Sequence, residues 1–358
     1  MLQFLARRML LLLPVLIGIL FITFTIGRLI PGDPCVVMLG EKATKATCDD
    51  FKERYGLNDN IAVQFVRYLG NMAKGDFGTS LRFGRPVTDL MSERLPMTLE
   101  LTIMAMIFST VFGILLGLIS ALKRNSFIDT FTMIIANIGV SMPVFWLGLM
   151  LAYVFALLLK DTAFALPPSA RFTSGISLEP LAKFYGIENP EGLQKFFLQF
   201  FGNLSLVNAI ITGNWKAFGD SLRHLLLPAI AVGTIPMSII ARMTRSSLLE
   251  VLGLDYIRTA RAKGMIERRV ISKHAMRNAM IPIITIIGIE TGGLLSGAVL
   301  TETTFSLPGV GTALVGAILA RDYPVVQGFT LVIALVFVLV NLIVDISYAY
   351  LDPRIRLD

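Results

Sequence analysis

The sequence predicts an all-α polytopic membrane protein with six transmembrane helices. Of its 358 residues, 54% are hydrophobic and only 16% are charged, and the mean hydropathy is +0.71. Soluble domains carry about 25% charged residues, so this balance indicates a membrane protein. The apolar residues also gather into stretches that reach the roughly 20 residues needed to cross a bilayer.

The predicted helices follow one another along the whole chain. The first is predicted to be retained, because its apolar core exceeds the roughly 7–15 residues of a signal peptide and no small-x-small cleavage site follows. The third is long enough to tilt or to extend past the membrane. Prolines predict kinks, which neighbouring helices tolerate by satisfying the freed carbonyl groups. The predicted spans are 9–30, 98–122, 130–159, 222–243, 279–300 and 326–350, and the prolines are Pro143, Pro228, Pro236 and Pro282.

The distribution of Lys and Arg predicts the orientation in the membrane. With the N-terminus inside, the cytoplasmic segments contain Arg7 and Arg8, Lys123 and Arg124, and most of the basic residues of 244–278. The outer segments are balanced, with nine basic and nine acidic residues in 31–97 and five of each in 160–221. Positive charge stays inside at every turn, so both termini are predicted to be cytoplasmic.

This orientation divides the chain into consecutive parts. They are an N-terminal helix (1–30), an outer segment (31–97), a membrane core (98–350) with an outer insertion (160–221) and a cytoplasmic loop (244–278), and a cytoplasmic tail (351–358). The two cysteines, Cys35 and Cys48, fall in the outer segment. A disulfide between them is expected if that compartment is oxidising, and two unpaired thiols are the alternative.

The sequence lacks the motifs of the common enzyme classes. The net charge of +7 lies beside apolar spans, which fits membrane orientation rather than nucleic-acid binding. There is no Gly-x-x-x-x-Gly-Lys-Ser/Thr loop for ATP and no His-Glu-x-x-His zinc motif, and His224 and His274 are the only histidines. We therefore expect no catalytic residues, no cofactor and no metal on this chain, which leaves transport or scaffolding.

The densest positive charge lies in the cytoplasmic loop. The stretch 242–277 contains nine Lys or Arg against three Asp or Glu, and the sequence "DYIRTARAKG" (255–264) forms its centre. Its composition predicts two short helices around Gly264. The small residues Ala260 and Gly264 would let another protein approach closely. Enforcement of topology and contact with anionic lipid are the alternatives.

This loop resembles the EAA loop of ABC-importer permeases, in the form found in the dipeptide and oligopeptide permease family. Arg258, Thr259 and Ala260 occupy the place of Glu-Ala-Ala, and Gly264 is the signature glycine. Arg258 in place of Glu and the continuation "HAMRN" (274–278) depart from the general pattern, and both are normal for the peptide branch. The resemblance assigns ATPase coupling to Asp255, Tyr256, Arg258, Thr259, Ala260, Arg261 and Gly264.

Eight further stretches resemble family motifs in the same order. They are "RLIPGDP" (28–34), "GDFGTS" (75–80), "RLPMTLEL" (94–101), "SMPVFWLGLML" (141–151), "RMTRSSLLEVL" (242–252), "TETTFSLPGVG" (301–311), "RDYPVVQG" (321–328) and "DPRIR" (352–356). Together with the loop, these motifs make the resemblance specific. The outer insertion, roughly 161–220, is the least similar part.

The resemblance implies a type I importer permease fold in the bacterial cytoplasmic (inner) membrane. It also implies partners: a second, homologous permease in a heterodimer, two ABC ATPase subunits and an extracytoplasmic substrate-binding protein. ATP and Mg²⁺ would be used by the ATPase subunits. ATP binding would close them, and the loop would transmit the movement that opens the pathway outward.

Two groups of residues are candidates for contacts with cargo and binding protein. Glu290 lies near the middle of the fifth predicted span, where an ionisable group marks a functional candidate. Gly293 and Gly297 share its helical face, so we expect these three residues to line the pathway and Glu290 to contact a peptide's α-ammonium. A structural, hydrogen-bonded Glu290 is the alternative. The outer loop with Glu302, Pro308 and Gly309 is a candidate contact for the binding protein. A plug of the pathway and a plain connector are the alternatives.

Three functions remain open at this stage. The first is permeation of dipeptides or oligopeptides. The second keeps the importer and changes its cargo to nickel or a metal chelate, although bare metal would want His or Cys ligands that the spans almost lack. The third is a membrane scaffold or receptor without transport, which a complete coupling loop argues against.

Overall fold

The computed structural model describes residues 2–29, 35, 43–54 and 58–351. These residues form helices joined by turns, with one isolated β-bridge between Thr79 and Pro86. The predicted all-α fold is confirmed. The helices are α1 Leu2–Leu29, α3 Lys45–Arg54, α4 Ile61–Ala73, α5 Val87–Leu122, α6 Phe127–Ser141, α7 Val144–Ala152, α8 Leu181–Phe184, α9 Gly192–Asn203, α10 Ser205–Ile211, α11 Trp215–Leu252, α12 Asp255–Ala262, α13 Glu267–Arg269, α14 Met276–Gly297, α15 Val299–Thr304, α16 Val310–Leu319 and α17 Tyr323–Leu351, with π-helical turns η2 Tyr153–Leu158 and η3 Val270–Ala275.

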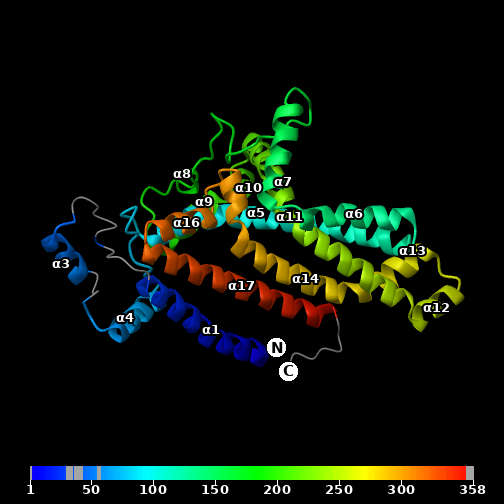
Figure 1. Ribbon diagram of the computed structural model, residues 1–358, viewed down its shortest axis with the longest axis horizontal. Helices are drawn as coiled ribbons and strands as arrows, with labels where there is room; N and C mark the ends of the chain where they lie inside the picture. Colours follow the sequence, from blue (N-terminus) through cyan, green and yellow to red (C-terminus); the bar gives the residue numbers. More distant parts are fainter. Residues whose placement is uncertain (1, 30–34, 36–42, 55–57, 352–358) are drawn as a thin grey trace.

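The long helices form an elongated bundle. Figure 1 shows α1, α5, α11, α14 and α17 running along the long axis, with α12 and α13 at one end and α3 and α4 at the other. Within the described ranges, four helices are long and apolar enough to cross a membrane, or five if the bent pair of α6 and α7 counts as one span. In α1 the stretch Pro14–Thr25 is apolar but shorter than these helices.

The third predicted span is not one continuous helix, which corrects the expectation for 130–159. Its two halves, Phe127–Ser141 and Val144–Leu158, meet at a bend of 107°. The break follows from Pro143, because a proline disfavours helical geometry at the residue before it. Met142 is extended (φ −112°, ψ 139°) and ends α6, and α7 starts after Pro143. Pro228, Pro236 and Pro282 instead lie inside continuous helices.

The centre of the fold is the parallel pair of α5 and α11. A Cβ added to Gly113 would lie 2.9 Å from the Cβ of Ile240, and one added to Gly117 would lie 2.5 Å from the carbonyl oxygen of Ala241. The two backbones therefore approach more closely than larger side chains would allow, as small residues permit in membrane helices. The Ser109 hydroxyl adds a hydrogen bond of 2.6 Å to the Gly233 carbonyl oxygen.

The outer insertion packs on the end of α5 through a buried carboxylate. Glu100 is 4% exposed and accepts hydrogen bonds from the Ser205 hydroxyl and the Leu206 backbone N–H, each at 2.7 Å. Arg171 lies 3.4 Å from the same carboxylate, and its guanidinium also donates to the Asn203 carbonyl oxygen. A buried charge needs such partners. These bonds place α9 and α10 against the bundle.

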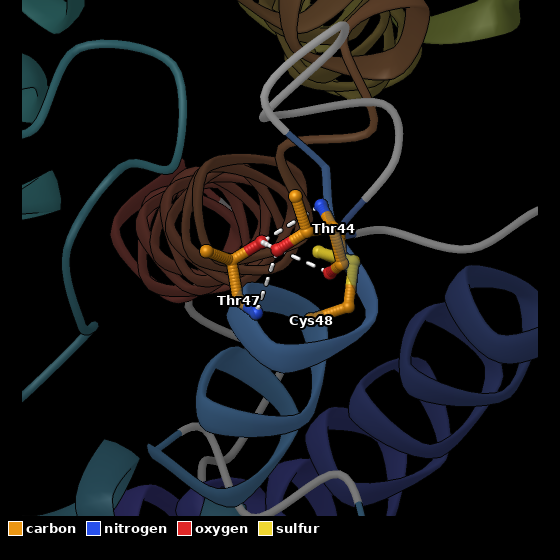
Figure 2. Close-up of a disulfide and its surroundings, with 4 residues drawn as sticks. Thr44, Thr47 and Cys48 are labelled. Atoms are coloured by element: carbon orange, nitrogen blue, oxygen red, sulfur yellow. Dashed lines mark hydrogen bonds between the residues drawn. A yellow bond between two sulfur atoms is a disulfide. The ribbon is translucent and has the colours of Figure 1, made fainter.

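The outer segment contains the disulfide that the sequence left open. Cys35 and Cys48 are bonded and close a loop with a sequence separation of 13. Figure 2 shows how α3 begins beside this bond: the Thr44 and Thr47 hydroxyls lie 3.0 Å apart, and the Thr44 N–H donates to Thr47 Oγ1 at 2.9 Å. This reciprocal capping satisfies N–H groups that a helix start leaves free.

Candidate coupling segment and pathway cavity

The helix α12 is anchored along one face. It follows α11 after the two-residue turn at Gly253 and Leu254 and lies at an end of the bundle (Figure 1). Ile257 is 0% exposed and Ala260 is 7% exposed, and both belong to the hydrophobic cluster that contains Val270 and Ala275. This apolar stripe fixes α12 to the start of the next helical segment.

The other face of α12 is open to solvent. Asp255, Tyr256, Arg258, Thr259 and Arg261 are exposed. Of the residues that the resemblance assigned to coupling, Ala260 is the exception, because its small side chain faces the core. The expectation that Ala260 leaves room for another protein is therefore corrected, since its size permits close packing inside the loop itself.

A left-handed turn at Gly264 follows α12, which ends at Ala262. Gly264 has φ +74°, a conformation that costs a residue with a Cβ about 1–2 kcal/mol. A Cβ built there meets no atom within 4 Å, so backbone geometry and not crowding requires glycine on this chain. The helical segment that begins at Glu267 follows, so two helical pieces flank Gly264.

Polar contacts hold the coupling loop in one arrangement. Arg261 donates to Glu267 across the turn, with Nη2–Oε1 at 2.6 Å and Nε–Oε2 at 3.1 Å. The hydrogen bonds to Glu267 raise the pKa of Arg261 above its ordinary value. The Asn278 side chain donates to the Tyr256 hydroxyl at 2.7 Å, which ties α12 to α14. The loop thus presents a charged surface, on which the side chains of Asp255 and Arg258 are 94% and 83% exposed.

Glu290 and Gly293 line one cavity of about 240 Å³. Glu290 is partly buried and Gly293 is exposed, and both belong to α14. The rest of the wall comes from α7, α11, α14 and α15, through Val144, Val232, Ile235, Pro236, Leu294, Leu300 and Thr301. The bend at Pro143 brings Val144 into this wall. Gly297 ends α14, and its surroundings lie outside the described side chains.

The outer loop with Glu302, Pro308 and Gly309 is more buried than the sequence indicated. Glu302 belongs to the helix α15 and is 0% exposed, and its carboxylate accepts hydrogen bonds from the Thr98 hydroxyl at 2.6 Å and the Thr312 N–H at 3.1 Å. Gly309 is buried against that carboxylate. Neither residue is accessible to a docking protein here, so the contact predicted for them is wrong for this conformation. Pro308 is partly exposed.

Sequence reasoning missed Glu100 and Asp129 and did not foresee the burial of Glu302; these three acids join distant segments. Glu100, Asp129 and Glu302 each hold partners from other helices. No local pattern identifies them, because the partners lie far away in sequence. In the part of the chain that the structure describes, no group of three or more His, Cys, Asp or Glu residues is arranged to hold a metal ion.

Comparison with known proteins assigns the chain to one family. The model of the binding-protein-dependent transport system inner membrane component matches residues 113–357, and the model of its N-terminal part matches residues 1–102. The chain belongs to this family of ABC-importer permeases. The family resemblance inferred from the loop and its accompanying motifs is thereby confirmed.

Relatives that match over almost their full length are named as permease proteins of peptide transport systems. The permease is 48% identical over 356 residues to the dipeptide transport system permease protein DppB of Alkalihalophilus pseudofirmus, covering 99% of this chain and 100% of that protein. It is 44% identical over 357 residues to the di/tripeptide transport system permease protein DppB of Pseudomonas aeruginosa, covering 99% of each. It is 38% identical to the oligopeptide transport system permease protein AppB of Bacillus subtilis, covering 99% and 100%. This family and the apolar helices place the chain in the bacterial cytoplasmic membrane, which it crosses several times.

Proposed function

We propose that this chain is the permease subunit of an ATP-driven importer that moves dipeptides or oligopeptides across the cytoplasmic membrane. The observation that carries the proposal is the 48% identity over the full chain to a dipeptide permease. An anchored helix with an exposed charged face, α12, supports it further, because it supplies a surface for an ATPase. ATP and Mg²⁺ are used by separate ATPase subunits, and this chain is not an enzyme.

The proposed assembly has this chain and a homologous permease at its centre. Two ATPase subunits bind below, and a soluble substrate-binding protein docks outside. The chain crosses the membrane six times with both termini in the cytoplasm, so that α1 supplies the first span and the bent pair of α6 and α7 the third. The separation of α12 from α3 and α4 at opposite ends of the bundle supports this orientation (Figure 1).

The proposed mechanism connects α12 to the Glu290 cavity. ATP binding closes the two ATPases, and α12 moves with them because its exposed face binds them. The other face of α12 is fixed to the permease, so the permease moves too. The movement reaches α11, which supplies Pro236 and Ile235 to the cavity wall. Glu290 lines this cavity and attracts the α-ammonium of the peptide, because opposite charges attract more strongly where water is partly displaced.

The test is uptake of a labelled dipeptide by cells that lack this chain, compared with cells complemented by the native gene. Labelled nickel is supplied in a parallel experiment. Restored peptide uptake supports the proposed cargo. Restored nickel uptake alone retains the importer and replaces the cargo. Restoration of neither, together with failure to co-purify with an ABC ATPase, favours a scaffold or receptor.

A further inference from the structure

A buried carboxylate joins three helices beside the coupling loop. Asp129 is 5% exposed and lies in the first turn of α6. Its Oδ1 accepts from Arg245 Nε at 2.9 Å, and its Oδ2 accepts from Arg245 Nη2 at 2.8 Å. The Ser120 hydroxyl of α5 and the Asn125 N–H, the latter at 3.0 Å, complete its hydrogen bonds.

The ion pair of Asp129 and Arg245 fixes the orientation of α6 relative to α11 as well as the distance between them. Two parallel hydrogen bonds between a guanidinium and a carboxylate allow only one relative orientation. Arg245 lies in the last part of α11, which ends at Leu252 shortly before α12. Ser120 lies near the end of α5. The start of α6 is therefore held by both helices of the central pair, next to the proposed ATPase contact.

A second set of contacts keeps α6 aligned with α11. The Asn137 side-chain oxygen accepts from Arg242 Nη1 at 2.7 Å and from the Ser238 hydroxyl at 3.2 Å. Further along, Gly139 lies so close to Thr234 that a Cβ would overlap it. Thus α6 must follow α11 along its length. Beyond the bend at Pro143, the helix α7 supplies Val144 to the wall of the Glu290 cavity.

Stability alone is a weak reason for such a pair. Removing two charges from water costs free energy that their attraction often only balances, so apolar replacements of buried pairs are frequently neutral. A bidentate pair at the junction of three helices instead specifies geometry. That property is useful where one helix must transmit a displacement to another.

We propose that Asp129 and Arg245 are positioning residues that transmit the movement of the coupling segment from α11 to α6, and through the bend at Pro143 to the wall of the Glu290 cavity. This inference rests on the proposed function, because it takes α12 as the point at which the ATPases act. Neither residue touches the cargo. Their role is to make α6 move with α11 during each ATP cycle.

The experiment uses the complete importer in proteoliposomes, with the loaded binding protein and a labelled dipeptide. The readout is dipeptide transported per ATP hydrolysed, because this ratio does not change when a variant simply assembles less well. Asp129→Asn preserves volume, and Arg245→Lys preserves charge while removing the bidentate contact. The matched control is Glu93→Gln in α5, which removes the exposed ion pair between Glu93 and Arg85.

Both variants are expected to hydrolyse ATP and to transport about tenfold fewer peptides per ATP, within the range for substitutions in coupling networks. Glu93→Gln is expected to leave the ratio unchanged. If Asp129→Asn and Arg245→Lys transport as many dipeptides per ATP as the native importer, the inference is overturned, even if less of each variant assembles. Gly264→Trp is measured alongside as a test of the proposed function. If it abolishes coupled transport while Asp129→Asn leaves the ratio unchanged, the proposed ATPase contact stands and the inference about this pair fails. If it leaves the ratio intact while Asp129→Asn lowers it, the proposed ATPase contact fails, and with it the route from α12 through this pair.

Discussion

The carboxylate of Glu302 accepts a hydrogen bond of 2.6 Å from the hydroxyl of Thr98, which joins the helix α15 to the helix α5. The same hydroxyl accepts from the Val310 N–H at 2.8 Å, so one threonine connects the outer end of α5 to two segments of the outer loop. Burial raises the pKa of Glu302, and the donors around it oppose that rise. Gly309 completes the site by leaving room for the carboxylate.

Gly309→Ala is predicted to destabilise the protein by about 1–3 kcal/mol, because the added Cβ would overlap the Glu302 carboxylate. Thermal unfolding of the purified permease in detergent measures the loss. The control is Gly219→Ala, since a Cβ at this helical glycine meets nothing within 4 Å. Equal melting temperatures for the two variants would refute the structural role assigned to Gly309.

Gly264→Trp is predicted to abolish coupled transport, and Gly213→Trp is predicted to retain it. Both glycines have positive φ, +74° and +68°, and open space around them, so both variants have the same backbone strain. They differ in place, because Gly264 lies beside the exposed face of α12 and Gly213 lies in the outer insertion. Dipeptide uptake by complemented cells is the measurement. Similar loss in both variants would mean that strain alone causes the defect.

The disulfide is predicted to be present in the mature protein. Cys35 and Cys48 are the only cysteines, so native permease from membranes should react with a maleimide only after reduction. Closing a loop of this size constrains the unfolded chain by about 3 kcal/mol, so Cys48→Ser should lower thermal stability. Labelling without a reductant would contradict both the bond and an oxidising, outer location for this segment.

The outer insertion is predicted to depend on Glu100. Replacing Glu100 with Ala leaves Arg171, Ser205 and Leu206 without their shared acceptor, and breaking a buried pair in this way costs about 3–5 kcal/mol. The insertion should then detach and be cleaved faster by trypsin added outside spheroplasts. Glu179→Gln removes an exposed pair with Lys183 in the same insertion and serves as the control. Cleavage of both variants at the native rate would contradict this account.

Glu290→Gln is predicted to reduce transport of dipeptides with a free N-terminus and to leave N-acetylated dipeptides unaffected. The reason is that glutamine keeps the volume of the side chain and removes the charge that would attract an α-ammonium. Competition between the two labelled peptides during uptake measures the preference. Unchanged rate and preference would show that Glu290 has a structural role in its cavity.

Helix positions were predictable where hydropathy alone decides them. The predicted spans 98–122 and 222–243 lie inside α5 and α11. The helix α5 starts earlier than predicted, and α11 is longer at both ends. The break at Pro143 was signalled by the proline, yet nothing local determines whether a membrane proline kinks or stops a helix. Pro236 lies inside a continuous helix, and Pro143 separates two.

The candidate site was predictable to the extent that it is local. The two helical pieces around Gly264 follow from composition and from the turn that glycine allows. The inward position of Ala260 does not, because it depends on packing against Val270 and Ala275. Glu302 was assigned to the surface for a similar reason: its partner Thr98 is separated from it by 204 residues, so its burial is decided by tertiary structure.

The most direct test of the central claim is photo-crosslinking from α12 in the assembled importer. A photoreactive amino acid replaces Arg258 on the exposed face of α12, and Lys216, exposed at the start of α11, is replaced in a control. The account predicts that the Arg258 position crosslinks to an ABC ATPase subunit, identified by mass spectrometry, and that the Lys216 position does not. Crosslinking of the ATPase from the Lys216 position would contradict this prediction. So would the absence of crosslinking from both positions in a complex that hydrolyses ATP.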